Sequence, residues 1–137
     1  MNYRQQDFVE AVSAFTGSNG VDVILDMVGG DYLSRNLKSL ASDGRLMQIG
    51  IQQGSKAEIN LAALLMKRLT LAGSTLRPRG DEFKTKIARQ LREKVWPLLE
   101  SGQVKPVIDS VFPLAEADRA HRLMESSQHI GKIILEL

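Results

Sequence analysis

The feature that most constrains this chain is an alternation of amphipathic helical segments with short, almost continuously apolar segments. Residues 21–28 read VDVILDMV, a β-branched run typical of a strand covered on both faces, as in a parallel sheet. They lie between residues 7–15 and residues 31–41, in which apolar side chains recur at helical spacing. This order predicts an α/β fold with a parallel sheet and flanking helices.

The same alternation continues to the end of the chain. It predicts strands at residues 45–50, 69–74 and 132–135, and short extended segments at 104–108 and 111–112. Further helices are predicted at residues 61–67, 81–101 and 116–126. Asn60 is placed to cap the first of these helices. Pro97 predicts a kink or an early end in the second, before a C-terminal cap at Gly102. No repeat or change of composition divides the chain, so a single domain is expected.

Composition excludes several classes of function. The sequence contains no cysteine, which excludes disulfides, thiolate metal sites and thiol nucleophiles and fits a reducing compartment. No apolar run approaches the ~20 residues of a membrane-spanning helix, and the N-terminus lacks the pattern of a signal peptide. We therefore expect a cytoplasmic protein that does not span a membrane. The basic residues of the predicted helix 81–101 lie opposite its apolar stripe without interleaved aromatic side chains, so a solvated face is favoured over a nucleic-acid site.

The glycines do not form a complete phosphate-binding motif. A doubly wound dinucleotide-binding sheet begins with a strand, a G-x-G-x-x-G loop and a helix. Gly17 and Gly20, Gly29 and Gly30, and Gly50 and Gly54 do not have that spacing, and the chain opens on a predicted helix. If the fold binds a dinucleotide, the chain is a partial Rossmann-like (doubly wound) parallel sheet with flanking helices, the second half only.

Three segments together resemble a known family. They are GVDVILDMVGGDYLSRNLKSLASDGRLMQIG, GSTLRPR and PLAEADRAHRLMESSQHIGKIILEL. In this order they are similar to the C-terminal part of medium-chain dehydrogenases/reductases, in the zinc-independent NADPH:quinone oxidoreductase branch. The resemblance implies that residues 1–137 are the C-terminal portion of a nucleotide-binding domain. It implies a fragment, engineered or arising from a mis-started reading frame, without the family's catalytic domain and glycine-rich loop.

The resemblance also implies a cofactor and a reaction. The parent protein would use NADPH to transfer hydride to quinones or related carbonyl or enone electrophiles, and the fragment alone is expected to be inactive and not to bind NADPH tightly. No catalytic or metal-ligating side chain is assigned. The cofactor-binding residues implied are Val28, Gly29, Gly50, Ile51 and Gln52 at the nicotinamide–ribose side, Tyr3 at the adenosine-phosphate end, and Leu76, Arg77, Pro78 and Ser127 nearby.

Each of these residues also has a simpler interpretation. Gly29 with Gly30 could form only a tight strand-to-helix turn, and Arg77 could be solvated. Asp26, at the end of its strand, could orient a loop or be an exposed or capped carboxylate. His121 is interpreted as a packed structural histidine rather than a ligand, because the sequence supplies only one other histidine and no cysteine.

Two alternative functions remain open. The chain could be a self-associating structural module, with a homodimer formed through the edge of the strand from Leu69 to Ser74, as in medium-chain reductases. It could also belong to another Rossmann-like enzyme such as a methyltransferase, since LASDGRLMQI resembles a strand of that fold. The terminal HIGKIILEL fits the reductases better.

Overall fold

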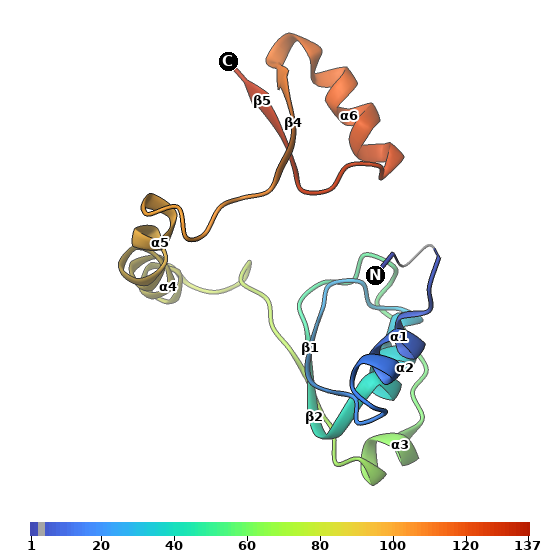
Figure 1. The fold of residues 1–137 in the computed structure, drawn as a ribbon. Coiled ribbons are helices and arrows are strands. Elements are labelled where there is room, and N and C mark those ends of the chain that lie inside the picture. The colour runs from blue at the N-terminus through green and yellow to red at the C-terminus, as the bar shows by residue number, and fades with distance from the viewer. Residues whose placement is uncertain (3–4) are drawn as a thin grey trace. The chain divides into compact units, whose positions relative to one another are not determined.

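The strands of this protein lie in two parallel sheets rather than the single sheet that the alternation predicts. A computed structural model describes residues 1–2 and 5–137. Three strands form one sheet in the order β1-β2-β3, and β4 and β5 form another. The two sheets belong to separate compact units, Met1–Arg79 and Gly80–Leu137 (Figure 1). Every strand pair is parallel, so the predicted α/β class is confirmed.

The first unit follows the predicted order of helices and strands. Its elements are α1 (Phe8–Phe15), β1 (Val21–Asp26), α2 (Tyr32–Ser39), β2 (Leu40–Gln48), α3 (Leu61–Met66) and β3 (Thr70–Gly73). The predicted cap of α3 is confirmed, because the Asn60 Oδ1 atom accepts from the Ala62 N–H at 2.9 Å. The prediction that α2 extends to residue 41 is wrong. Leu40 is extended, fully buried and pairs with Val21 on β1, and this burial outweighs the helical pattern.

The core of the first unit lies on one face of its sheet. Helices α1, α2 and α3 lie to one side of β1 and β2 (Figure 1). The buried cluster consists of Leu37, Leu40, Leu46 and Leu69. On β1, by contrast, Val23 is 59% exposed and Leu25 is 62% exposed. The expectation that this strand is covered on both faces is therefore wrong, because the helices of this unit cover only one face.

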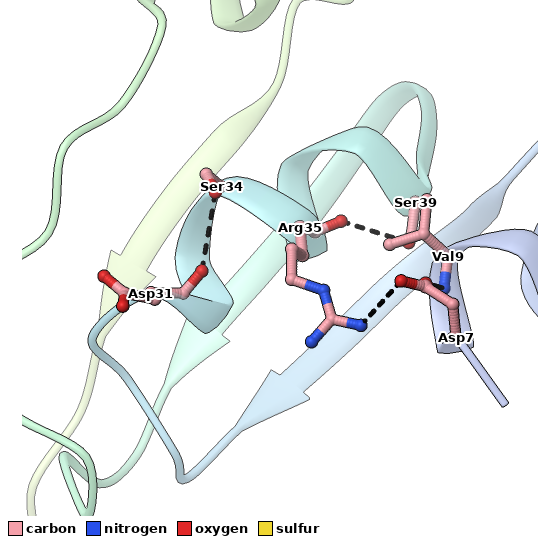
Figure 2. Close-up of polar contacts among 6 residues, drawn as sticks. All are labelled: Asp7, Val9, Asp31, Ser34, Arg35 and Ser39. Carbon is pink, nitrogen blue, oxygen red and sulfur yellow. Dashed lines mark hydrogen bonds and ion pairs between the residues drawn. The ribbon is translucent and has the colours of Figure 1, made fainter. Parts of the chain in front are cut away.

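Helices α1 and α2 are held together by a cluster around Arg35. The Arg35 Nη2 atom donates to the Asp7 Oδ2 atom at 3.1 Å, while Asp7 Oδ1 accepts from the Val9 N–H and caps α1 (Figure 2). The Arg35 guanidinium lies 4.4 Å from the centroid of the Phe8 ring and 5.3 Å from that of Tyr32. The two rings are stacked with centroids 5.6 Å apart. The ion pair, the Arg35–Phe8 contact and the stacked rings thus join α1 to α2, whereas the Arg35–Tyr32 contact lies within α2.

The second unit contains the remaining helices and strands. They are α4 (Asp81–Lys94), α5 (Trp96–Glu100), β4 (Ile108–Pro113), the 3-10 turn η1 (Leu114–Glu116), α6 (Ala117–Ser126) and β5 (Lys132–Glu136). The break predicted from Pro97 is confirmed: the helix divides at Val95, and Pro97 lies in the first turn of α5, where its missing N–H removes no helical bond. Gly102 follows α5 with φ +73°, as expected of a C-terminal cap.

Other predictions for this unit are corrected by the structure. The extended segment expected at residues 104–108 joins a strand only from Ile108. His121 is exposed, not packed. The apolar stripe predicted for α4 is also largely uncovered, since Phe83 and Leu91 are each 47% exposed. Within residues 1–2 and 5–137, none of the helices has both the length and the apolar character needed to cross a bilayer.

Candidate functional site

The carboxyl ends of β1, β2 and β3 bring three loops to one edge of the sheet. Because these strands are parallel, the chain leaves each of them at the same edge, where ligands bind in open α/β sheets. Backbone hydrogen bonds continue beyond the strands. The Ile49 N–H donates to the Asp26 carbonyl at 2.7 Å, and the Ser74 N–H donates to the Gln48 carbonyl at 3.0 Å. The three loops therefore start from fixed positions.

The loop after β1 and the loop after β2 are joined to each other. The Gln53 N–H donates to the Val28 carbonyl at 2.8 Å, and the Gly30 N–H donates to the Gly54 carbonyl at 3.1 Å. Gly29 has φ +70°, and a Cβ atom there would lie 2.8 Å from the Gly54 carbonyl oxygen. A Cβ at Gly50 would lie 2.8 Å from the Met27 carbonyl oxygen. The close approach of the two loops is therefore enough to require glycine at both positions, whether or not a ligand binds there.

The Asp26 carboxylate lies beneath these loops and is 4% exposed. Its Oδ1 atom accepts from the Val28 N–H at 2.6 Å and from the Gly29 N–H at 3.3 Å. Its Oδ2 atom accepts from the same Gly29 N–H at 3.3 Å and from Asn36 Nδ2, on α2, at 3.1 Å. Asp26 therefore orients a loop, one of the two roles that the sequence left open for it.

Three hollows open around this edge. The first, of ≈ 350 Å³, has walls that include Gly29, Ile51, Leu71 and Gly73. The second, of ≈ 620 Å³, has walls that include Gly50, Ile51, Pro78 and Arg79. The third, of ≈ 600 Å³, lies against α1, β1 and α2 and is lined in part by Val28 and Gln52. Gln48, Ile51 and Gly73 line both of the first two hollows. The predicted nicotinamide-side residues thus gather at one edge but face different hollows.

The other predicted site residues have different locations. Leu76 and Arg77 lie in the exposed segment that follows β3. Ser127 belongs to the second unit, where it ends α6 with φ +53°. Tyr3 lies outside the described residues. Whether any of these four residues contacts a cofactor stays a prediction.

Sequence reasoning missed Asn36 and Gln48. Asn36 is buried on α2 and binds Asp26. Gln48 ends β2, and its Nε2 atom donates to the Gly50 carbonyl at 2.6 Å and to the Asp26 carbonyl at 3.3 Å. The available signal was a polar side chain inside an apolar helix stripe or at a strand end, where a buried polar group needs a partner.

The chemistry of the described residues does not suit a metal ion. No group of three His, Cys, Asp or Glu side chains converges anywhere in residues 1–2 and 5–137, and the sequence has no cysteine. A zinc site normally takes three or four such ligands. The described residues alone therefore do not fit zinc.

Comparison with known proteins places this arrangement in a family. Residues 1–135 match the family model described as zinc-binding dehydrogenase. The chain is 33% identical to quinone oxidoreductase-like protein 2 of Bos taurus, over 100% of this chain and 39% of that protein. It is 33% identical to the quinone oxidoreductase of Rattus norvegicus, over 99% of this chain and 40% of that protein.

Solved structures give the same result for the fold. A putative alcohol dehydrogenase from Sinorhizobium meliloti 1021 superposes with a TM-score of 0.74 at 31% identity, over 100% of this chain and 37% of that one. The chain thus spans about two fifths of the length of the curated relatives above. This chain belongs to the zinc-binding dehydrogenase family and corresponds to the C-terminal part of a medium-chain dehydrogenase/reductase.

Proposed function

We propose that this chain forms the nicotinamide-facing wall of an NADPH-dependent oxidoreductase that transfers hydride to quinones or related carbonyl or enone electrophiles. The observation that carries the proposal is the pair of joined loops at the carboxyl ends of β1 and β2, with hollows of ≈ 350 and ≈ 620 Å³ beside them. These volumes lie in the range of small-molecule sites. The names of the two quinone oxidoreductase relatives support the substrate class.

The residues around the hollows suit part of such a cofactor. When bound, the reduced nicotinamide supplies the hydride, and the protein supplies position and a dry environment. Ile51 and Leu71 offer apolar surface in the wall of the first hollow. Because Gly29 and Gly50 have no side chain, the backbones of both loops can approach each other closely. Arg79 lines the second hollow, and its guanidinium suits a phosphate-bearing ligand.

The proposal makes a direct prediction for the chain by itself. Because its sequence lacks a G-x-G-x-x-G loop, the grip on the diphosphate is missing. Calorimetric titration of the 137-residue chain with NADPH should show no tight binding. Binding in the micromolar range would mean that the loop is dispensable and that this account of the site is wrong.

A second measurement tests the location of the wall. NADPH added at high concentration should shift the NMR amide signals of Gly29, Gly50 and Ile51, while amides on β5 of the second unit serve as the control. S-adenosylmethionine should leave the same signals unchanged, which separates the proposal from the methyltransferase alternative. If NADPH shifts none of the three, the proposed wall is contradicted.

Self-association through β3 is a second candidate function, because one edge of that strand is open. In the described part of the chain β3 pairs only with β2, and Leu71 is 40% exposed. An unpaired strand edge favours association with a second copy. Sedimentation should show a homodimer that Leu71→Lys dissociates, whereas Leu25→Lys, on the exposed face of β1, should not. A clean monomer at high concentration contradicts this function.

We also place the protein in the cytoplasm. The absence of cysteine fits a reducing compartment, and cell fractionation with an antibody to the chain tests it. Recovery in a membrane or secreted fraction would contradict the assignment.

A further inference from the structure

One buried carboxylate at the proposed wall has no part in the function described above. Asp26 is among the least exposed polar residues of the described chain, yet it lies at the end of β1, one residue from the loop. Within the described residues, the four contacts of its carboxylate all come from N–H donors. Both oxygens of the carboxylate therefore act there as hydrogen-bond acceptors.

These contacts fix the direction of the backbone after β1. The bond from the Val28 N–H to the Asp26 side chain closes an Asx-type turn. The turn directs the carbonyl groups of Met27 and Val28 toward the loop after β2, where they accept from the N–H groups of Gln52 and Gln53 at 3.2 and 2.8 Å. One side chain therefore sets the first loop directly and the second loop through the first.

Asn36 connects this turn to α2. It is 5% exposed, and its Nδ2 atom donates to Asp26 Oδ2. The contact joins the end of β1 to the middle of the helix that covers the sheet. Burying a charged and a polar group costs free energy unless both are hydrogen-bonded. Because both residues lie directly beneath the two loops, we attribute their burial to holding these loops rather than to packing alone.

We propose that Asp26, held by Asn36, is the positioning residue that keeps the Val28–Gly29 backbone and the loop at residues 51–54 in the shape that receives the nicotinamide end of the cofactor. The inference rests on the proposed function for the identity of the ligand. The proposed mechanical role of Asp26 rests instead on the hydrogen bonds of the chain itself. Neither residue contacts a reacting atom, so neither is catalytic.

The test compares Asp26→Asn with Asp22→Asn in the 137-residue chain. Both changes remove one carboxylate from β1, but Asp22 is exposed, so it is a matched control. In Asp26→Asn the new amide group faces the Asn36 amide and can accept through one oxygen only. Amide hydrogen exchange at Val28, Gly29, Gln52 and Gln53 should quicken by about tenfold, as expected when bonds to a charged acceptor are weakened. Exchange of the Leu46 amide on β2 should be unchanged, because the loops alone depend on Asp26. A general loss of structure would accelerate exchange at Leu46 as well.

A second variant keeps the proposal testable if Asp26→Asn folds poorly, and NADPH titration adds a second measurement. Asn36→Ala leaves three of the four contacts of Asp26 and should quicken exchange at the same four amides by a smaller factor. NADPH at high concentration should shift the Gly29 and Ile51 signals of the wild type and of Asp22→Asn, but shift them less in Asp26→Asn.

The outcomes separate this inference from the proposed function. Unchanged exchange of the loop amides in both Asp26→Asn and Asn36→Ala overturns the positioning role, whatever the result of the NADPH titration. Exchange that rises equally throughout the first unit also overturns it in favour of a structural role. If loop exchange is faster in Asp26→Asn but the wild-type signals do not respond to NADPH, the proposed function is overturned. The cofactor is then not the ligand of the loops that Asp26 positions. Only faster loop exchange with a weakened NADPH response supports the inference.

Discussion

The two units of this chain differ in how far they bury their apolar residues. The first unit encloses a cluster of leucines from α2, β2 and the approach to β3. Among residues 80–137, all of which the structure describes, Ala120 is the one apolar residue that is less exposed than Leu69, the most exposed member of that cluster. Both units contain amphipathic helices and parallel strands. The difference shows that an apolar pattern becomes a core only where a second element supplies the opposing surface.

Helix α4 and helix α2 illustrate this point. The stripe of α2 contains Leu33 and Leu37 and faces the sheet, so Leu37 is 3% exposed. The stripe of α4 is at least as regular, yet Phe83 and Leu91 remain about half exposed. Periodicity predicts which face of a helix is apolar, but it does not predict whether that face is covered.

The largest predicted effect tests whether the core is confined to the first unit. Leu46→Ala removes a side chain that is 1% exposed, so the free energy of unfolding of the first unit should fall by about 2–5 kcal/mol. Leu91→Ala, the same change on α4, should lower the free energy of unfolding of the second unit by less than about 1 kcal/mol, because its side chain is already half exposed. Urea unfolding followed by residue-resolved NMR measures each unit separately. Equal losses would contradict the comparison.

The next effect concerns tight backbone approach in the first unit. Gly20 has φ +84°, and a Cβ atom there would lie 2.7 Å from backbone atoms of Ser39, Leu40 and Ala41. Gly20→Ala should therefore lower the free energy of unfolding of the first unit by roughly 1–3 kcal/mol through strain and displacement of β2.

Gly17→Ala is the matched control for that prediction. Gly17 also has a positive φ, of +59°, but nothing lies within 4 Å of its Cβ position. Only the backbone penalty of about 1 kcal/mol applies there. If both variants lose the same amount of stability, close packing at Gly20 is not the cause.

Most of the fold could be predicted from local patterns. The helix cap at Asn60 and the break near Pro97 depend on neighbouring residues, and both are present. The parallel pairing of the strands follows from the alternation of helices and strands, and it is present as well. The end of α2 could not be predicted, because Leu40 continues the helical stripe and becomes a strand residue only through its burial against β1. The division into two sheets is likewise a tertiary property that no local pattern records.

For the candidate site, the sequence identified the edge but not its construction. Gly29, Gly50 and Ile51 come together because parallel strands end at one edge, which the strand pattern already implies. The contact between Asp26 and Asn36 joins residues on different elements, so their spacing gives no signal. Likewise, the glycines after the strands are visible in the sequence, but only the structure shows that the atoms closest to them belong to the neighbouring loop.

A smaller effect compares Arg35 and Arg119, each of which lies over an aromatic ring. Arg35 lies over Phe8 and Tyr32, pairs with Asp7 and joins two helices. Arg119 lies 5.7 Å from the centroid of Phe112 and pairs with Glu116 one turn away. Arg35→Ala should lower the free energy of unfolding of the first unit by about 1 kcal/mol, and Arg119→Ala should cost its own unit less, because its side chain is more exposed. The same urea experiment measures both, and a larger effect at Arg119 would contradict the stated role of Arg35.

The smallest effect is a dependence of the stability of each unit on pH, caused by one aspartate in each unit, Asp43 in the first and Asp118 in the second. The hydrogen bond from Arg68 is the main cause that lowers the pKa of Asp43 below its ordinary 3.8; desolvation opposes it, and the Arg68 charge lowers the pKa further. In the second unit, the hydrogen bond from Arg122 is the main cause that lowers the pKa of Asp118. A carboxyl group whose folded pKa is lowered stabilises the folded state above its unfolded pKa, and this contribution is lost as the pH falls through the folded value.

Substitution should therefore flatten the acid dependence of one unit at a time. Asp43→Asn should reduce the loss of stability of the first unit below pH 3.8 and leave that of the second unit unchanged, and Asp118→Asn should do the reverse. Both ion pairs are well exposed, so the changes should be small and should shrink further in high salt. Residue-resolved unfolding at a series of acid pH values checks this. If either variant alters the acid dependence of both units, the two units are coupled in stability, and the contrast between their cores must then be measured on the whole chain rather than on each unit.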